Sequence, residues 1–186
     1  MTRGIKLFSL FFPILMLGQS RVGEWKSYPS FLNVRETIEV GDLLVSATSG
    51  GILLYNREAL SFETVTNIDG LVETDLSVIA EDGNGHLWLG GAAPNGTVQI
   101  YDLAKRQSVK IFNFDLWEVT AFAVSDSVVC AAYSKDGQWG ILEFVMLNGE
   151  FSYRQIYNPS DESLESINGL VLRGDFLFAA TDRGLF

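Results

Sequence analysis

Short apolar runs separated by tight polar turns recur along most of the chain, and they predict β-strands. The runs are rich in branched and aromatic side chains, which is typical of strands. The turns between them contain Gly, Asp and Asn, which supply the left-handed backbone that two-residue hairpins need. No stretch shows convincing helical periodicity. The pattern therefore predicts an all-β protein built from antiparallel hairpins.

One element returns at a nearly constant interval, a glycine that opens a short apolar strand. These glycines are 45, 44 and 44 residues apart, at Gly51, Gly96, Gly140 and Gly184. Two apolar strands joined by a turn precede each glycine, and an alternating strand follows each of the first three. Four antiparallel strands in about 40–45 residues make up one β-propeller blade. We therefore expect a β-propeller whose first two strands in each blade are buried on both faces, with the fourth at the outer edge.

The repeat also predicts the limits of the blades. Three and a half blades cannot close a ring, because propellers typically have ~4–8 blades. We therefore expect residues 21–186 to be the N-terminal fragment of a longer propeller, with the remaining blades downstream of Phe186. The expected blades lie at about residues 34–66, 75–113 and 118–157, with the start of a fourth at about 167–186.

Residues 1–20 have the layout of a secretory signal peptide. Arg3 and Lys6 precede the apolar run Leu7–Leu17, and small or polar residues follow it. A bilayer span needs roughly 20 apolar residues, so a cleaved leader is favoured over an uncleaved anchor. We expect cleavage after Ser20 and export to the periplasm, cell surface or exterior of a bacterium. No integral membrane span is expected in the rest of the sequence.

Composition narrows the classes of function. The 186 residues include 23 acidic and 13 basic side chains, for a net charge of −10. Nucleic-acid surfaces need clustered Lys and Arg, so we expect no nucleic-acid partner. One His and one Cys exclude a disulfide framework and His- or Cys-based metal clusters, and we expect neither a metal nor a cofactor.

The position of the lone histidine argues against catalysis. A hydrolase triad needs a histidine or an equivalent base beside a nucleophile. His86 directly follows the turn Asp82–Gly85, at the end of the blade opposite the loops that usually bind ligands. The same turn superficially suggests a calcium loop, but its twelfth position is Ala93 rather than a bidentate Glu. The sequence therefore predicts a protein that is not an enzyme.

The loops between second and third strands, and the links between blades, are better candidates for a site. In a propeller they gather on one face around the mouth of the channel. Trp117 and Asp115 lie at one such link; alternatively, Trp117 and Trp139 pack between blades. An aromatic side chain beside charged and amide groups is typical of a recognition surface. We expect this face to bind a protein, peptide or glycan through Trp139, Lys135, Asp136, Asn95, Asp182 and Arg183.

Several segments resemble a known family of repeats. Gly85–Gly91 resembles the signature of two-component regulator propeller repeats, and Ser49–Asn56 is similar to the motif that follows it there. Asp69–Leu71 resembles the link between blades in the same family. The opening Gly23–Tyr28 is similar to the start of PorZ-like propellers of the type IX secretion system. The third unit departs from the signature because it lacks the Leu-Trp pair.

These resemblances imply different functions on one fold. The PorZ-like one implies an exported, surface-associated, non-catalytic component that helps to process or attach cargo proteins. The regulator one implies a periplasmic ligand-sensing propeller that precedes a membrane span and a kinase. A further alternative is a propeller enzyme whose catalytic residues lie in later blades.

Overall fold

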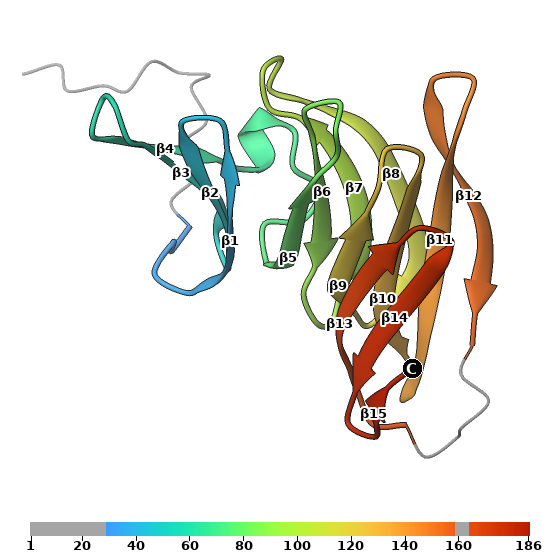
Figure 1. Ribbon diagram of the computed structural model, residues 1–186. Helices are drawn as coiled ribbons and strands as arrows, with labels where there is room; N and C mark the ends of the chain where they lie inside the picture. The colour runs from blue at the N-terminus through green and yellow to red at the C-terminus, as the bar shows by residue number, and fades with distance from the viewer. Residues whose placement is uncertain (1–28, 159–163) are drawn as a thin grey trace, which may run out of the picture.

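A computed structural model describes residues 29–158 and 164–186 of the chain. The predicted leader and the opening Gly23–Tyr28 lie outside the described residues. The described residues form four antiparallel sheets and one short 3-10 helix, η1 (Asn67–Asp69) (Figure 1). The prediction of an all-β protein is confirmed.

Each sheet is a meander in which strands that follow one another along the chain lie side by side. The first sheet contains β1 (Val34–Val40), β2 (Leu43–Thr48), β3 (Gly51–Asn56) and β4 (Ser61–Val65). The second contains β5 (Leu76–Glu81), β6 (His86–Gly91), β7 (Gly96–Asp102) and β8 (Gln107–Leu116). The third contains β9 (Glu118–Val124), β10 (Val128–Lys135), β11 (Gln138–Leu147) and β12 (Glu150–Tyr157). The fourth has three strands, β13 (Ile167–Arg173), β14 (Phe176–Thr181) and β15 (Gly184–Leu185).

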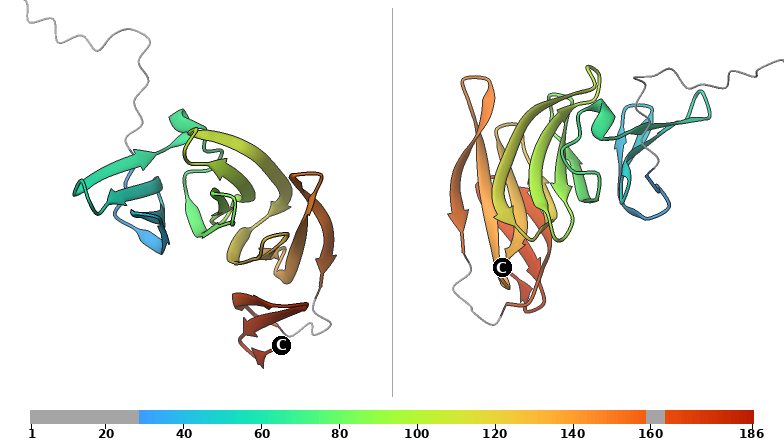
Figure 2. Two further views of the ribbon diagram at one scale, coloured as in Figure 1. Left: turned by 45° about the horizontal axis from the view of Figure 1, so that its top comes forward. Right: turned by 180° about the vertical axis from the view of Figure 1, so that it is seen from behind.

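The four sheets stand side by side along an open arc (Figure 2, left). The first strand of each sheet contacts the first strand of the next, so that β1, β5, β9 and β13 form an inner row. We call these four the inner strands. The radial stacking of successive meanders is the arrangement expected of propeller blades.

A separate apolar cluster fills each space between neighbouring sheets. The cluster between the second and third sheets is built around Trp88, which is fully buried. Its ring lies 5.3 Å from that of Phe144 and 4.9 Å from that of Phe151, measured between centroids. A buried aromatic side chain removes about 150–250 Å² from water, so these rings supply much of the cohesion between the two sheets.

Burial agrees with the prediction for the second strands β6 and β10 and for the outer strand β8, but not in every sheet. The second strand β14 has one buried residue, Ala179, and β4 is exposed at every position but its last. The second strands β6 and β10 are almost wholly buried, and β8 alternates between exposed and half-buried positions as an outer strand should. The expectation that the first strands are buried on both faces is wrong for β1, where no residue is fully buried. It is also wrong for β13, where only Ile167 and Leu170 are buried. The first and fourth sheets each have a neighbour on one side only, so their inner strands keep one face in solvent.

Candidate functional site

The turns between second and third strands lie at one end of the sheets, and we call this end the loop face. It consists of residues 49–50, 92–95, 136–137 and 182–183. The other turns within each meander lie at the opposite end. In Figure 1 the loop face forms the lower edge of the second, third and fourth sheets.

Hydrogen bonds on the loop face fix the link between the second and third sheets. The Gly96 backbone N–H donates to the carbonyl of Trp117 at 3.1 Å, and the Trp117 N–H donates to the carbonyl of Ser134 at 2.8 Å. Nearby, Lys135 Nζ donates to the carbonyl of Phe114 at 2.7 Å. The backbone of Trp117 is therefore held from both sides, between the turns of two neighbouring sheets.

The indole of Trp117 nevertheless points into solvent. Its side chain is 55% exposed, whereas Trp88 is fully buried. Asn95 and Asp136 are exposed on the adjoining turns, and Asp115 is exposed in the strand that leads to the link. We call Asn95, Asp115, Trp117, Lys135 and Asp136 the Trp117 surface. It presents one large apolar side chain among amide and carboxylate groups, a composition suited to binding.

The sequence-predicted site residues fall into three groups. Asn95, Lys135 and Asp136 lie beside Trp117, although the ammonium of Lys135 is already bonded to a backbone carbonyl. Trp139 is half-buried and packs against the apolar cluster between the third and fourth sheets. The alternative that both tryptophans pack between blades therefore holds for Trp139 and is wrong for Trp117.

Asp182 and Arg183 belong to the turn of the fourth sheet. Asp182 Oδ1 accepts hydrogen bonds from the backbone N–H groups of Glu165 and Ser166, at 3.0 and 3.1 Å. Arg183 Nε lies 3.2 Å from Asp182 Oδ2. The carboxylate of Asp182 therefore ties this turn to the segment that enters the fourth sheet.

Sequence reasoning placed Trp117 at a link but did not choose it as a site residue. The sequence does contain one signal that Trp117 is exposed: Asp115 stands two positions before it and Glu118 directly after it. Charged neighbours on both sides indicate that this part of the chain faces water. The fixed backbone, in contrast, depends on contacts with two other sheets, which no local pattern shows.

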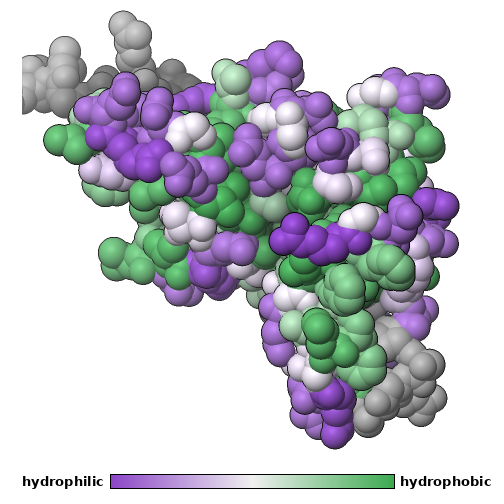
Figure 3. Space-filling view, viewed as in Figure 1, coloured by the Kyte–Doolittle hydropathy of each residue, from purple (hydrophilic) through white to green (hydrophobic). Residues whose placement is uncertain are grey.

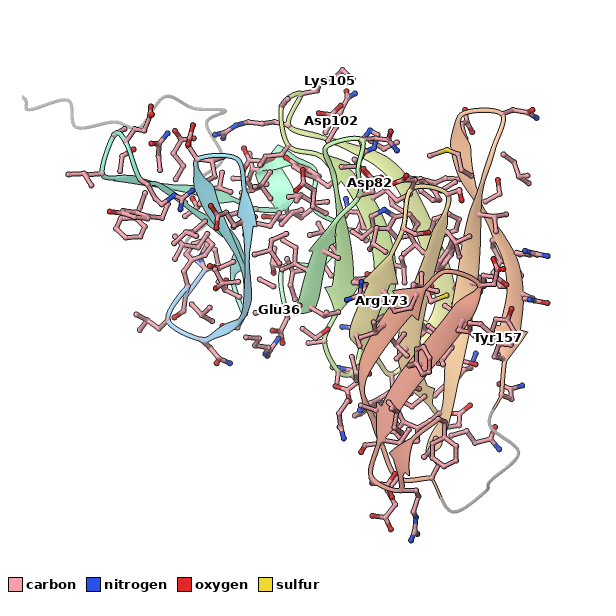
Figure 4. The ribbon with its side chains drawn as sticks, in the orientation of Figure 1. Glu36, Asp82, Asp102, Lys105, Tyr157 and Arg173 are labelled. Carbon is pink, nitrogen blue, oxygen red and sulfur yellow. The ribbon has the colours of Figure 1, made fainter. Side chains whose placement is uncertain are left out.

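The lone histidine forms part of a capped hairpin turn. Asp82, only 2% exposed, accepts hydrogen bonds at Oδ1 from the backbone N–H groups of Asn84 and His86, at 2.9 and 3.0 Å. Its Oδ2 lies 3.3 Å from His86 Nδ1 and accepts from Trp88 Nε1 at 3.3 Å. Figure 4 shows Asp82 at the upper end of the second sheet, away from the loop face. The carboxylate of Asp82 therefore caps the turn through Oδ1 and binds the indole N–H of the buried Trp88 through Oδ2.

A hollow of about 790 Å³ opens between the third and fourth sheets. Glu143 is one of the polar residues that line it. The carboxylate of Glu143 accepts hydrogen bonds from Gln155 Nε2 at 2.6 Å, Tyr157 Oη at 2.8 Å and Arg154 Nη1 at 3.3 Å. Because the described part of the fourth sheet ends with the two-residue strand β15, this outer part of the third sheet is left uncovered.

Two of the titratable groups that line this hollow, Cys130 and Tyr157, have raised pKa values and so favour their protonated forms. Burial, and secondarily the charge of Glu143, raises the pKa of the Cys130 thiol to about 12. The hydrogen bond to Glu143, together with burial, raises the pKa of Tyr157. A thiol that stays protonated at neutral pH is a poor nucleophile. The hollow thus offers no activated nucleophile at Cys130.

Residues 29–158 and 164–186 contain no group of three His, Cys, Asp or Glu side chains arranged to hold a metal ion. The same ranges contain no helix with the length and apolarity of a membrane span.

Comparison with solved structures identifies the fold. The computationally designed Ika4 protein matches with a TM-score of 0.62 and 13% identity, over 86% of this chain and 94% of that chain. The N-terminal domain of Nup159 matches with a TM-score of 0.57 and 19% identity, over 80% of this chain and 39% of that one. U3-55K matches with a TM-score of 0.56 and 15% identity, over 75% of this chain and 45% of the U3-55K chain.

These likenesses show that the chain has a β-propeller fold. The chain spans about two fifths of the matched Nup159 chain and less than half of the U3-55K chain. No protein-family model and no curated protein matches the sequence.

Proposed function

We propose that this chain is a non-catalytic β-propeller scaffold that binds a protein or peptide partner at the Trp117 surface. The observation that carries the proposal is the half-exposed indole of Trp117 on a backbone hydrogen-bonded to both neighbouring turns. A tryptophan whose backbone is already fixed loses less entropy on binding than one in a free loop, and tryptophan is enriched among the residues that dominate interfaces.

The charges around the indole favour a basic partner. Asp115 and Glu118 lie within two positions of Trp117 and Asp136 lies on the adjoining turn, so these carboxylates outnumber the ammonium of Lys135, which donates to the Phe114 carbonyl. The net charge of −10 extends the same preference over the molecule. An Arg or Lys side chain of a peptide would lie over the indole face and pair with these carboxylates. A glycan offers no cation for this arrangement.

The propeller neighbours and the sequence motifs support three parts of the proposal: binding of a protein partner, export, and a ring with more blades. One matched structure is a complex of S. cerevisiae Dbp5 bound to Nup159, Gle1, IP6 and ADP, with a TM-score of 0.55 and 19% identity over 79% of this chain and 38% of that chain. The leader-like N-terminus and the PorZ-like opening support an exported, surface-associated component. The open arc supports a ring that further blades complete.

A peptide selection tests the binding site. Phage-displayed peptides are selected on the immobilised chain, and the affinities of those recovered are measured by calorimetry. Trp117→Ala should weaken binding by roughly 30-fold, which corresponds to a hot spot of about 2 kcal/mol. Leu147→Ala is the matched control, since Leu147 is also 55% exposed but lies at the opposite end of the third sheet.

Two outcomes would contradict the proposal. Peptides that bind the parent and Trp117→Ala alike would show that the surface is not the site. Glycans captured from an array in place of peptides would overturn the class of partner.

A further inference from the structure

The dipeptide Asn-Gly occurs at residues 84–85, 95–96, 148–149 and 168–169. The asparagine of such a pair loses its side-chain amide when the backbone nitrogen of the following residue attacks its Cγ atom. Glycine in second place favours the attack, because it has no side chain to obstruct the approach. The attack also requires that this nitrogen be free to leave its place in the fold. Since the two reacting residues are the same in all four pairs, the fold decides which pair reacts.

The pair at residues 95–96 is held on the loop face. The Gly96 N–H donates to the carbonyl of Trp117 at 3.1 Å. Gly96 is also buried, and a Cβ atom built on it would lie 2.8 Å from the backbone N of Glu118. Attack by the Gly96 nitrogen must therefore break a hydrogen bond and move a closely packed link between two sheets.

The pairs at residues 84–85 and 168–169 are held as well. The Gly85 N–H donates to the carbonyl of Asp82 at 3.1 Å, in the turn that the Asp82 carboxylate caps. Gly169 lies inside β13, where it pairs with Ala180 of β14. In both places the glycine backbone is part of an ordered hydrogen-bonded segment.

The pair at residues 148–149 forms the centre of a two-residue turn between β11 and β12. The flanking residues Leu147 and Glu150 pair with each other and close the hairpin. The φ angles of Asn148 and Gly149 are 54° and 85°, the left-handed values of a type I′ turn. Within the described residues, neither the side chain of Asn148 nor the N–H of Gly149 makes a hydrogen bond. The attacking nitrogen and the carbon that it attacks are therefore both unrestrained.

This turn is also open to solvent. All four residues from Leu147 to Glu150 are exposed. Figure 1 shows the turn at the tip of the long β11–β12 hairpin, at the end of the sheets opposite the loop face. In the space-filling view, hydrophilic residues gather at this tip, at the upper right (Figure 3). Hydroxide and water, which the reaction consumes, therefore reach the turn directly.

We propose that Asn148 is the deamidation site of this chain and that the fold protects Asn84, Asn95 and Asn168. Base removes the proton from the Gly149 nitrogen, which then forms a bond to Asn148 Cγ. The bond between Cγ and the side-chain nitrogen breaks, and that nitrogen leaves as ammonia with its two protons and one from solvent. Water opens the resulting five-membered succinimide ring at either carbonyl, to give aspartate or isoaspartate. One water is consumed and one ammonia is released.

Peptide mapping by mass spectrometry follows all four pairs in one sample of the folded chain, kept at mildly alkaline pH. Asn148 should convert at least about fivefold faster than each of the other three asparagines, because opening one hydrogen bond at their glycines costs a factor of that order. Circular dichroism checks that the chain stays folded. The same chain unfolded in guanidinium chloride is the matched control, in which all four asparagines should convert at similar rates.

Asn148→Gln provides a second readout on the intact protein. Each conversion adds one negative charge, so the parent should accumulate an acidic form in anion-exchange chromatography. The variant should accumulate far less of it, because attack on a glutamine side chain closes a larger ring more slowly. Conversion of Asn84, Asn95 or Asn168 as fast as Asn148 in the folded chain would overturn the proposal. Conversion of Asn148 in the unfolded chain alone would overturn it too.

Discussion

Trp117 and Trp139 lie at the same end of the third sheet but differ in burial because of where each meets the strand pattern. Trp139 is two positions before Ile141 in β11, so both side chains point to the same face, toward the fourth sheet. Trp117 occupies the bend between β8 and β9, where its backbone is bonded to Gly96 and Ser134 while its side chain stays outside the alternating pattern of either strand. One position contributes to the core, and the other leaves an aromatic side chain available for binding.

Gly90 tests how tightly β6 is packed against the paired strand β5 and against β9 of the third sheet. A Cβ atom at this position would lie 2.4 Å from Val78 Cγ1 and 2.9 Å from Val119 Cβ. Gly90→Ala should therefore lower the free energy of unfolding by about 1–3 kcal/mol through overpacking. Urea denaturation measures the change.

Gly83→Ala is the control for this substitution. The nearest atom to a Cβ at Gly83 is Asp126 Oδ1, at 3.5 Å, which is ordinary contact. Its effect should stay within about 0.5 kcal/mol. Equal effects of the two substitutions would contradict the close packing of the sheets at Gly90.

At the scale of elements, β10 carries a thiol whose ionisation opposes folding. The pKa of Cys130 is raised to about 12 from an ordinary value near 9. A group with a raised pKa contributes stability below its unfolded pKa, and that stability is lost as pH rises through the folded pKa. The free energy of unfolding should therefore fall between about pH 9 and 12, and less steeply in Cys130→Ala than in the parent.

Urea titrations at a series of alkaline pH values measure this difference in slope. Tyr101, Tyr133 and Tyr157, whose pKa values are also raised, are present in both proteins and so cancel in the comparison. Identical slopes for the parent and the variant would show that Cys130 is not buried between the third and fourth sheets.

The sequence predicts the positions of the strands better than it predicts which residues are buried between sheets. Gly51, Gly96 and Gly184 each open a third strand, and Gly140 lies within one, because a glycine-led turn and an apolar run are local features. The exposure of β1 and the orientation of Trp117 were not predictable in this way. The exposure of β1 depends on which neighbouring sheet is present, and the setting of Trp117 depends on backbone hydrogen bonds to Gly96 and Ser134 in two different sheets.

For the whole molecule, the stacking repeats with a constant direction, since Arg35, Ser77 and Thr120 each donate a side-chain hydrogen bond from the inner strand of one sheet to the inner strand of the next. This leaves two unlike faces, one at each end of the arc, and the loop face is separate from both. Partner binding at Trp117 and stacking of the sheets therefore use different surfaces.

The order of the inner strands is the most direct test of this architecture, and nuclear Overhauser effects measured by solution NMR report it. We expect cross-peaks between Ser77 and Val119 and between Thr120 and Ile167, so that β9 has neighbours on both sides. A β-sandwich would instead give cross-peaks between sheets that do not follow one another along the chain. Contacts between the first and fourth sheets within one molecule, with none between β5 and β9, would contradict the propeller.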